Sequence, residues 1–312
     1  MSIAVRIIVC AESESAATVA AESAFRRIHE LEARMTDFDS DSELMQMCRL
    51  AGKTGEPVAV GDDLFRVLKK SKQISIESQG AFDITVGPVV RLWRRARRLH
   101  EFPEKRLLDD ARALVGNDLW ELDDEAKTVT IKKDKVLFDL GAIAKGDIID
   151  QAVAVLQNHG IAAALVDAGG DIRAYGVPCD NDATGWLIGV SAHGKEVGRV
   201  VSDSIAMASS GDLSRYVIFD GVRYSHIVDP KTGIGLTNQT AVTVFAPDAT
   251  TADALATALS VLPPEEGMNL LAQYEGTAAM ICRQLPQSDQ DAQNETEVWY
   301  SENWEKLVTA VE

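Results

Sequence analysis

The second half of the chain contains a series of short apolar runs separated by turns, and this pattern limits the possible folds most. The strand-like runs are Ala163–Val166, Ile172–Tyr175, Trp186–Val190, Val197–Val201, Arg215–Phe219, Arg223–Ile227 and Thr240–Phe245. Helical periodicity is grouped separately, over Ser15–Met35, Asp63–Gln79, Leu107–Val115, Asp147–His159, Thr251–Val261 and Glu265–Gln273. This grouping predicts an α+β fold with a mainly antiparallel sheet core and flanking helices. A doubly wound nucleotide fold is not indicated, because the chain has no GxGxxG or Walker loop.

Five further segments complete the prediction. They are the strands Ile3–Cys10 and Thr277–Cys282, a hairpin of Leu119–Leu122 with Thr128–Ile131, a surface loop over Pro286–Glu295 and a closing segment around Trp304. The first strand contains an arginine, so it does not read as a signal peptide. No stretch is long enough to cross a bilayer, and we expect no export signal within this chain.

Composition restricts the classes of ligand. The 312 residues carry a formal net charge of −17, which argues against nucleic-acid binding because that needs an excess of Lys and Arg. A phosphate-bearing ligand would therefore need a metal ion or a local cationic pocket. The four cysteines show no CxxC and no histidines at zinc spacing, so we expect four free thiols.

The segment Asp139–Gly146 is the first candidate for such a pocket. An apolar strand end, Val136–Phe138, runs into small residues, then Lys145 and a helix. Main-chain amides at a helix start favour anions, and a lysine adds a charge for phosphate. The alternative is a tight strand-to-helix turn with a solvated lysine.

Asp253 and Thr257 form a second candidate, because four residues apart on a helix their oxygens share a face. A carboxylate, a hydroxyl and main-chain carbonyls make a site that Mg²⁺ accepts. The alternative is a capping box of Thr250 and Asp253 that holds no metal.

The remaining polar segments leave two interpretations each. His226 could take a proton from an attacking hydroxyl, or it could be a half-buried histidine bonded to a carbonyl before a turn. The turns Ala168–Asp171 and Ser209–Asp212 could bring backbone close to a cofactor, or be simple glycine turns. The basic run Arg91–Arg98 reads as a solvated helical face, with docking of an acidic partner as the alternative. The aspartates of the Thr36–Ser42 loop lack EF-hand order, so no calcium site is predicted.

The order of these segments resembles the ApbE-type FAD:protein FMN transferases from about Ile3 to Leu271. The blocks that carry the resemblance are MTDFDSDSEL, GAFDITVGPVVRLW, DLGAIAKGDIIDQA, LVDAGGDIRAYG, ASSGDLSRY, YSHIVDPKTG and APDATTADALATAL. The resemblance implies a T-fold-related α+β unit over residues 1–312, with two lobes sharing one FAD cleft. It departs in two respects. Leu213 stands where the family usually has an aromatic residue, and family members are commonly periplasmic or lipid-anchored, whereas we expect no export signal in this chain.

The resemblance further implies roles for residues. Mg²⁺ would be held by Asp253, Thr257 and the carbonyl of Ala142, and His226 would be the catalytic base. Contacts to the flavin and adenine of FAD would come from Met35, Ala81, Phe82, Asp83, Asp139 and Lys145. The glycine turns and the histidine segment add Gly169, Gly170, Asp171, Ser210, Gly211 and Asp229 as candidate cofactor contacts.

The implied reaction transfers FMN from FAD to a threonine hydroxyl of an acceptor flavoprotein, often a subunit of a membrane redox complex, and releases AMP. Two other functions remain open from the sequence. One is a magnesium-dependent FAD pyrophosphatase that gives FMN and AMP, and the other is a carrier that binds FAD without turnover.

Overall fold

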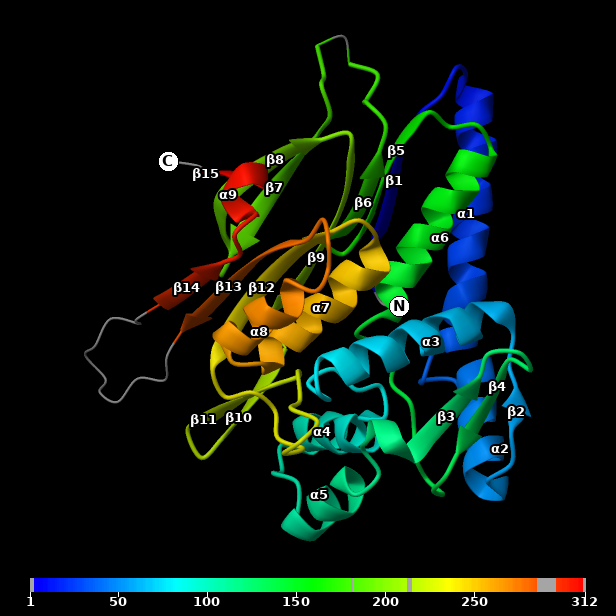
Figure 1. The fold of residues 1–312 in the computed structure, drawn as a ribbon, viewed down its shortest axis with the longest axis vertical. Coiled ribbons are helices and arrows are strands. Elements are labelled where there is room, and N and C mark those ends of the chain that lie inside the picture. Colours follow the sequence, from blue (N-terminus) through cyan, green and yellow to red (C-terminus); the bar gives the residue numbers. More distant parts are fainter. Residues whose placement is uncertain (1–2, 181, 212–214, 285–295, 311–312) are drawn as a thin grey trace.

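A seven-stranded sheet forms the centre of the molecule, in the order β1-β5-β6-β9-β12-β13-β14 with every neighbouring pair antiparallel (Figure 1). The computed structural model describes residues 3–180, 182–211, 215–284 and 296–310. The strands are β1 (Val5–Cys10), β5 (Ala163–Ala168), β6 (Asp171–Tyr175), β9 (Ser204–Gly211), β12 (Gln239–Ala246), β13 (Ala278–Gln284) and β14 (Thr296–Tyr300). The predicted α+β fold with a mainly antiparallel sheet is confirmed.

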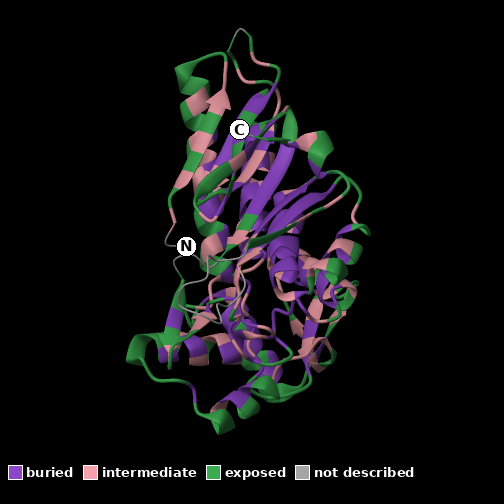
Figure 2. Cartoon of the chain, turned by 90° about the vertical axis from the view of Figure 1, so that its left-hand side faces the viewer, coloured by how far each residue is buried: buried purple, intermediate pink, exposed green. Residues whose placement is uncertain are grey.

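Both faces of the sheet are covered, and the strand residues alternate accordingly. On β5, Ala164 and Val166 pack toward the helices, whereas Ala163 and Leu165 pack toward the opposite layer. The helices on the first face are α1 (Glu14–Met35), α6 (Ala144–Asn158), α7 (Ala249–Val261) and α8 (Pro264–Leu271). The opposite layer consists of β7 (Trp186–Ala192), β8 (Lys195–Ser202), α9 (Trp304–Leu307) and β15 (Thr309–Ala310). Figure 2 shows the buried residues concentrated in the sheet and the helices against it.

A second region lies beyond one end of the large sheet (Figure 1). Its helices are α2 (Glu43–Thr54), α3 (Asp62–Glu77), α4 (Gly87–Leu99), α5 (Lys105–Arg112) and the short η1 (Asn117–Leu119). Its strands are β2 (Val58–Ala59), β3 (Trp120–Asp123), β4 (Thr128–Ile131), β10 (Tyr216–Phe219) and β11 (Val222–Ser225). The hairpin β10–β11 packs on α4 and α5 through a separate apolar cluster that includes Val89, Trp93 and Val217.

Several elements differ from the sequence-based expectation. Helix α2 and strand β14 were not predicted, and Ser209–Gly211 ends strand β9 rather than forming a turn. Helix α6 begins at Ala144, so Lys145 lies in its first turn. Val136–Phe138 forms no strand; Leu137 makes only an isolated bridge with Val86. The loop predicted over Pro286–Glu295 lies outside the described residues.

The expectation of four free thiols is wrong for two of the cysteines. Cys10 on β1 and Cys179 form a disulfide across 169 residues of sequence, whereas Cys48 and Cys282 are free and buried. Spacing along the chain could not indicate this pair, because the fold alone brings β1 beside the segment that follows β6.

Candidate active site at the meeting of α6 and α7

The first turn of α6 touches the start of α7 at Gly146. A Cβ atom placed on Gly146 would lie 2.2 Å from the main-chain oxygen of Ala249 and 2.7 Å from Cα of Thr250. No side chain larger than hydrogen fits there without moving one helix. Gly146 therefore sets the distance between the two segments that carry the predicted phosphate and metal ligands.

Three charged side chains meet beside this contact. Nζ of Lys145 lies 2.6 Å from Oδ2 of Asp171, and both side chains are largely buried. Oδ1 of Asp171 accepts a hydrogen bond from the main-chain N–H of Ser209 at 3.1 Å. Oδ2 of Asp253 accepts one from the N–H of Gly146, also at 3.1 Å. The cluster joins α6, α7, β6 and β9.

Burial dominates the electrostatics of this cluster. It raises the pKa of Asp253 to about 7, although the positive charge of Lys145 acts in the opposite direction. Burial likewise raises the pKa of Asp171. For Lys145 burial favours the neutral form, but the carboxylates of Asp253 and Asp171 outweigh it and the pKa ends above its ordinary value. One lysine thus faces two buried carboxyl groups, and a further cation would stabilise their ionised forms.

The predicted metal ligands lie on α7 and in the turn that precedes α6, and their oxygen atoms are of the kind that a hard cation accepts. Thr257 lies one turn after Asp253 on α7 and is half-buried, and Ala142 is half-buried in the turn that precedes α6. Within the described residues no three His, Cys, Asp or Glu side chains gather to hold a metal. A cation at Asp253 would therefore also need neutral oxygens, and a hydroxyl with a main-chain carbonyl suits Mg²⁺.

The capping-box alternative for Asp253 is wrong. The N-cap of α7 is Asp248, whose carboxylate accepts from the N–H of Thr251 at 2.7 Å. Asp150 of α6 adds a second cap, because its two oxygens accept from the N–H groups of Ala249 and Thr250, each at 2.9 Å. With these caps in place, the carboxylate of Asp253 is directed to α6 instead.

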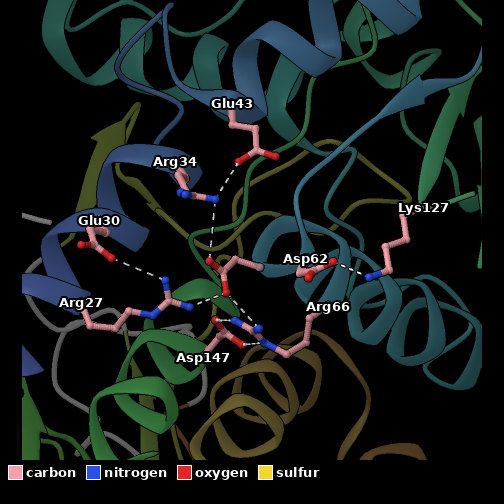
Figure 3. Close-up of polar contacts among 9 residues, drawn as sticks. Arg27, Glu30, Arg34, Glu43, Asp62, Arg66, Lys127 and Asp147 are labelled. Carbon is pink, nitrogen blue, oxygen red and sulfur yellow. Dashed lines mark hydrogen bonds and ion pairs between the residues drawn. The ribbon is translucent and has the colours of Figure 1, made fainter. Parts of the chain in front are cut away.

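Asp147 anchors the same turn of α6 to the second region (Figure 3). Arg66 of α3 donates to Asp147 from Nε at 2.8 Å and from Nη2 at 2.9 Å. Arg66 also bonds Asp63 at 3.1 Å, and Asp63 pairs with Arg27 of α1. Two-point pairs of this kind fix orientation, so the start of α6 is held from α3 as well as from α7.

Asp139 is paired with a residue of the basic run. Arg94 of α4 donates to Asp139 at 2.8 Å and also pairs with Asp37, and its guanidinium lies 4.5 Å from the ring centre of Phe38. Burial and the nearby charge of Asp37 raise the pKa of Asp139, which Arg94 opposes. The solvated-face interpretation is therefore wrong for Arg94, while Arg91, Arg95, Arg97 and Arg98 are exposed.

Other predicted FAD contacts have buried side chains. Met35, Ala81 and Phe82 belong to the main apolar core. Asp83 is buried, and its Oδ1 accepts from both the N–H and the hydroxyl of Thr85. In this structure, these four side chains therefore contact other residues of the chain, through apolar packing or hydrogen bonds.

The glycine turn and the strand end lie on neighbouring strands. Gly169 and Gly170 are exposed between β5 and β6, both with positive φ, and Gly170 donates to Asp167 at 2.9 Å. Ser210 and Gly211 end β9, which pairs with β6. Asp212 and Leu213 lie outside the described residues.

His226 directly follows β11 and is exposed. Its Nδ1 lies 3.2 Å from the carbonyl oxygen of Arg215, which also accepts from the N–H of His226 at 2.9 Å. A carbonyl can only accept, so this contact favours the imidazole tautomer that has its proton on Nδ1. Asp229 is used locally, because its two oxygens accept from the N–H of Lys231 and the hydroxyl of Thr232.

A separate pocket of about 370 Å³ does not include Lys145, Asp171 or Asp253. Its cations Arg66, Lys70 and Arg173 are matched by Asp147, Asp150 and Asp248. The amides at the start of α7 already bind Asp150, so this pocket offers no net attraction for a pyrophosphate.

The sequence matches the model of the ApbE family over residues 1–281. The chain belongs to the ApbE family. A protein named FAD:protein FMN transferase from Vibrio cholerae is 35% identical over 265 residues, covering 83% of this chain and 78% of that protein. One of the same name from Haemophilus influenzae is 31% identical over 266 residues, covering 82% and 76%.

Solved ApbE structures have the same fold. The flavin transferase ApbE from Vibrio cholerae superposes with a TM-score of 0.82 at 28% identity, covering 98% of this chain and 96% of that one. The ApbE protein from Thermotoga maritima gives 0.83 at 28% identity, covering 97% and 95%. Among the described residues of this family member, no helix combines the length and apolar character that a membrane span needs.

Two positioning residues of this ApbE chain, Asp150 and Arg94, were not among the predicted site residues. Asp150 caps α7 and Arg94 bonds Asp139, whereas Asp171 was predicted as a cofactor contact and its carboxylate pairs with Lys145. For Asp150 a signal existed, since the block GDIIDQ places two aspartates three residues apart in the first turns of a helix. The partners of Arg94 and Asp171 lie far away in sequence and gave no such signal.

Proposed function

We propose that this chain is an FAD:protein FMN transferase, which moves FMN from FAD to the hydroxyl of a threonine in an acceptor flavoprotein and releases AMP. The observation that carries the proposal is the buried cluster of Lys145, Asp171 and Asp253 where α6 meets α7. The names of the related proteins support it. We further propose that the acceptor is a subunit of a membrane redox complex and that FAD lies in a cleft between the two regions of the fold.

Lys145 is suited to meet a phosphate. Its raised pKa keeps the ammonium group charged at neutral pH, and the ion pair with Asp171 fixes its position. The pyrophosphate of FAD carries about two negative charges, which a chain with a net charge of −17 must neutralise locally. Mg²⁺ held by Asp253, Thr257 and the carbonyl of Ala142 would supply the remaining positive charge when bound.

His226 is suited to accept the proton of the acceptor hydroxyl. The carbonyl of Arg215 holds Nδ1 in its protonated form, so Nε2 is the basic atom. As the threonine oxygen bonds to the FMN phosphorus, its proton passes to Nε2 and the bond between that phosphorus and the oxygen of AMP breaks. Because His226 is exposed, the side chain of a second protein has access to it.

The test combines the protein with FAD, Mg²⁺ and a flavoprotein domain that has a threonine at its flavin site and was purified from cells without a flavin transferase. Intact-mass spectrometry should find an FMN-sized addition on the domain together with one equivalent of AMP, and EDTA or a Thr→Val acceptor should abolish it. Equal AMP release without acceptor and no addition would instead indicate a pyrophosphatase. Bound FAD without any AMP would indicate a carrier.

A further inference from the structure

The outer face of the hairpin β10–β11 exposes large apolar side chains. The two strands pair Tyr216 with Ser225 and Ile218 with Arg223, so Tyr216, Ile218 and Arg223 share one face. Tyr216 is 41% exposed and Ile218 is 57% exposed. We propose that this face is the docking surface for the acceptor protein, an inference that rests on the proposed function.

The inner face of the hairpin explains why the outer face is rigidly presented. Tyr224 lies 5.2 Å from the ring of Trp93 on α4, and Phe219 lies 5.6 Å from the ring of Phe102. Val217 is buried in the same cluster. These contacts seat the hairpin, so the exposed residues need no further contact for folding. Single exposed apolar side chains are ordinary, but adjoining ones mark interaction surfaces, and Tyr216 and Ile218 adjoin on one face of β10.

The hairpin is followed directly by His226, the residue that we propose as the general base. His226 follows the last residue of β11, and its N–H and ring both bond the carbonyl of Arg215, which precedes β10. The positive charge of Arg215, at the start of the hairpin, is among the charges that act on the pKa of Lys145 in the buried cluster, although other groups outweigh it. An acceptor that brings its hydroxyl to His226 must therefore lie against this hairpin.

The chemistry of the face indicates what part of the acceptor fits. The guanidinium of Arg223 lies 4.3 Å from the ring centre of Tyr216, and Arg215 is exposed at the start of the hairpin. The exposed cation Arg215 beside these apolar side chains matches an apolar segment with acidic neighbours. Charges farther apart than about 8 Å are largely screened at physiological salt, so this local cation acts despite the acidic charge of the whole chain. The occupant we infer is the acidic, partly apolar segment around the acceptor threonine.

The experiment compares Tyr216→Thr/Ile218→Thr with Leu187→Thr in the full chain. Threonine keeps strand propensity while removing the apolar surface. Leu187 is a matched control because it is 64% exposed on β7, in the layer on the other side of the large sheet. With the acceptor domain described above, the double variant should raise KM for the acceptor about 10-fold or more, while the dissociation constant for FAD stays unchanged. The control variant should match the wild type in both quantities.

Other outcomes would overturn the inference. If the double variant flavinylates the acceptor with the wild-type KM, or if Leu187→Thr impairs it equally, the hairpin is not the docking surface. If sedimentation shows a wild-type dimer that the double variant abolishes, the face binds a second copy instead. If the wild type binds FAD but never modifies an acceptor, the proposed transferase function itself is wrong. This outcome is measured on the wild type alone, so it is distinguishable from failure of the docking inference.

Discussion

The carboxylate of Asp253 on α7 accepts a hydrogen bond from the main-chain N–H of Gly146 on α6 at 3.1 Å. This bond lies where Gly146 of α6 is packed against the main chain of Ala249 and Thr250 at the start of α7. It places a buried carboxyl group beside Lys145, whose own partner Asp171 comes from the sheet. The charged cluster therefore depends on packing between main chains as much as on the identity of its acidic residues.

Asp253→Asn should separate activity from stability. Burial disfavours the ionised carboxyl, as the pKa near 7 indicates, so the neutral amide should melt at or above the wild-type temperature in EDTA. FMN transfer should nevertheless fall by about 10²-fold or more and lose its dependence on Mg²⁺. Thermal melts and mass-spectrometric transfer assays check both parts. Asp63→Asn, at a carboxylate remote from Mg²⁺ in our assignment, is the control and should keep the metal dependence.

Gly146→Ala should damage the site through packing. The new Cβ would meet the main chain of Ala249 at 2.2 Å, so one helix must move, at a cost of about 1–3 kcal/mol in unfolding free energy. Transfer should fall with it because Lys145 and Asp253 separate. Gly52→Ala in α2 is the control, since its nearest neighbours lie at 3.8 Å and alanine is the better helix former. Wild-type transfer by Gly146→Ala would show that the helix contact does not position the cluster.

His226→Ala should retain FAD binding and lose most of the transfer rate. Removing a general base costs about 10²- to 10⁴-fold, and the loss should appear in kcat rather than in the dissociation constant for FAD. Asp229→Ala offers a comparison three residues away, because its carboxylate accepts hydrogen bonds from Lys231 and Thr232 in its own turn. Assays stopped at timed intervals and read by mass spectrometry would measure kcat for both variants. A His226→Ala enzyme with normal kcat would move the base elsewhere.

The fold class could be predicted because period-two and helical patterns survive in local sequence. Residues such as Ala20, Ala24 and Ile28 recur at helical spacing and are buried in α1 as expected. Strand β9 could not be predicted from local pattern, since its run Ser204–Gly211 is rich in small and polar residues. It forms a strand because β6 and β12 pair with it on both sides, and such pairing partners are distant in sequence.

For the candidate site, too, the sequence could predict individual residues but not the contacts between distant segments. Lys145, Asp253 and His226 stand in segments whose residue types suggest chemistry, so the sequence could nominate them. The bond from Gly146 to Asp253 and the pair of Arg94 with Asp139 join residues 107 and 45 positions apart. No local pattern encodes such contacts, and one pattern even suggested the wrong partner, Thr250, for Asp253.

Asp63→Asn should lower stability in a pH-dependent way. Burial alone would raise the pKa of Asp63, but hydrogen bonds from Arg27 and Arg66 outweigh it and hold the pKa below its ordinary 3.8 (Arg27 and Arg66 are drawn in Figure 3). A lowered carboxyl pKa contributes stability above the unfolded value, and this contribution is lost as the pH falls through the folded value. At pH 7 we expect a loss of about 1–3 kcal/mol in unfolding free energy.

Urea melts of wild type and Asp63→Asn across pH 7 to 3 would check this sign. The difference in unfolding free energy should be constant above about pH 5 and should shrink below about pH 4, as the wild-type carboxylate takes up its proton. Asp124→Asn removes an exposed pair with Lys69 and should change stability little at any pH. A difference for Asp63→Asn that grows on acidification would mean that its arginine partners do not stabilise the ionised carboxyl.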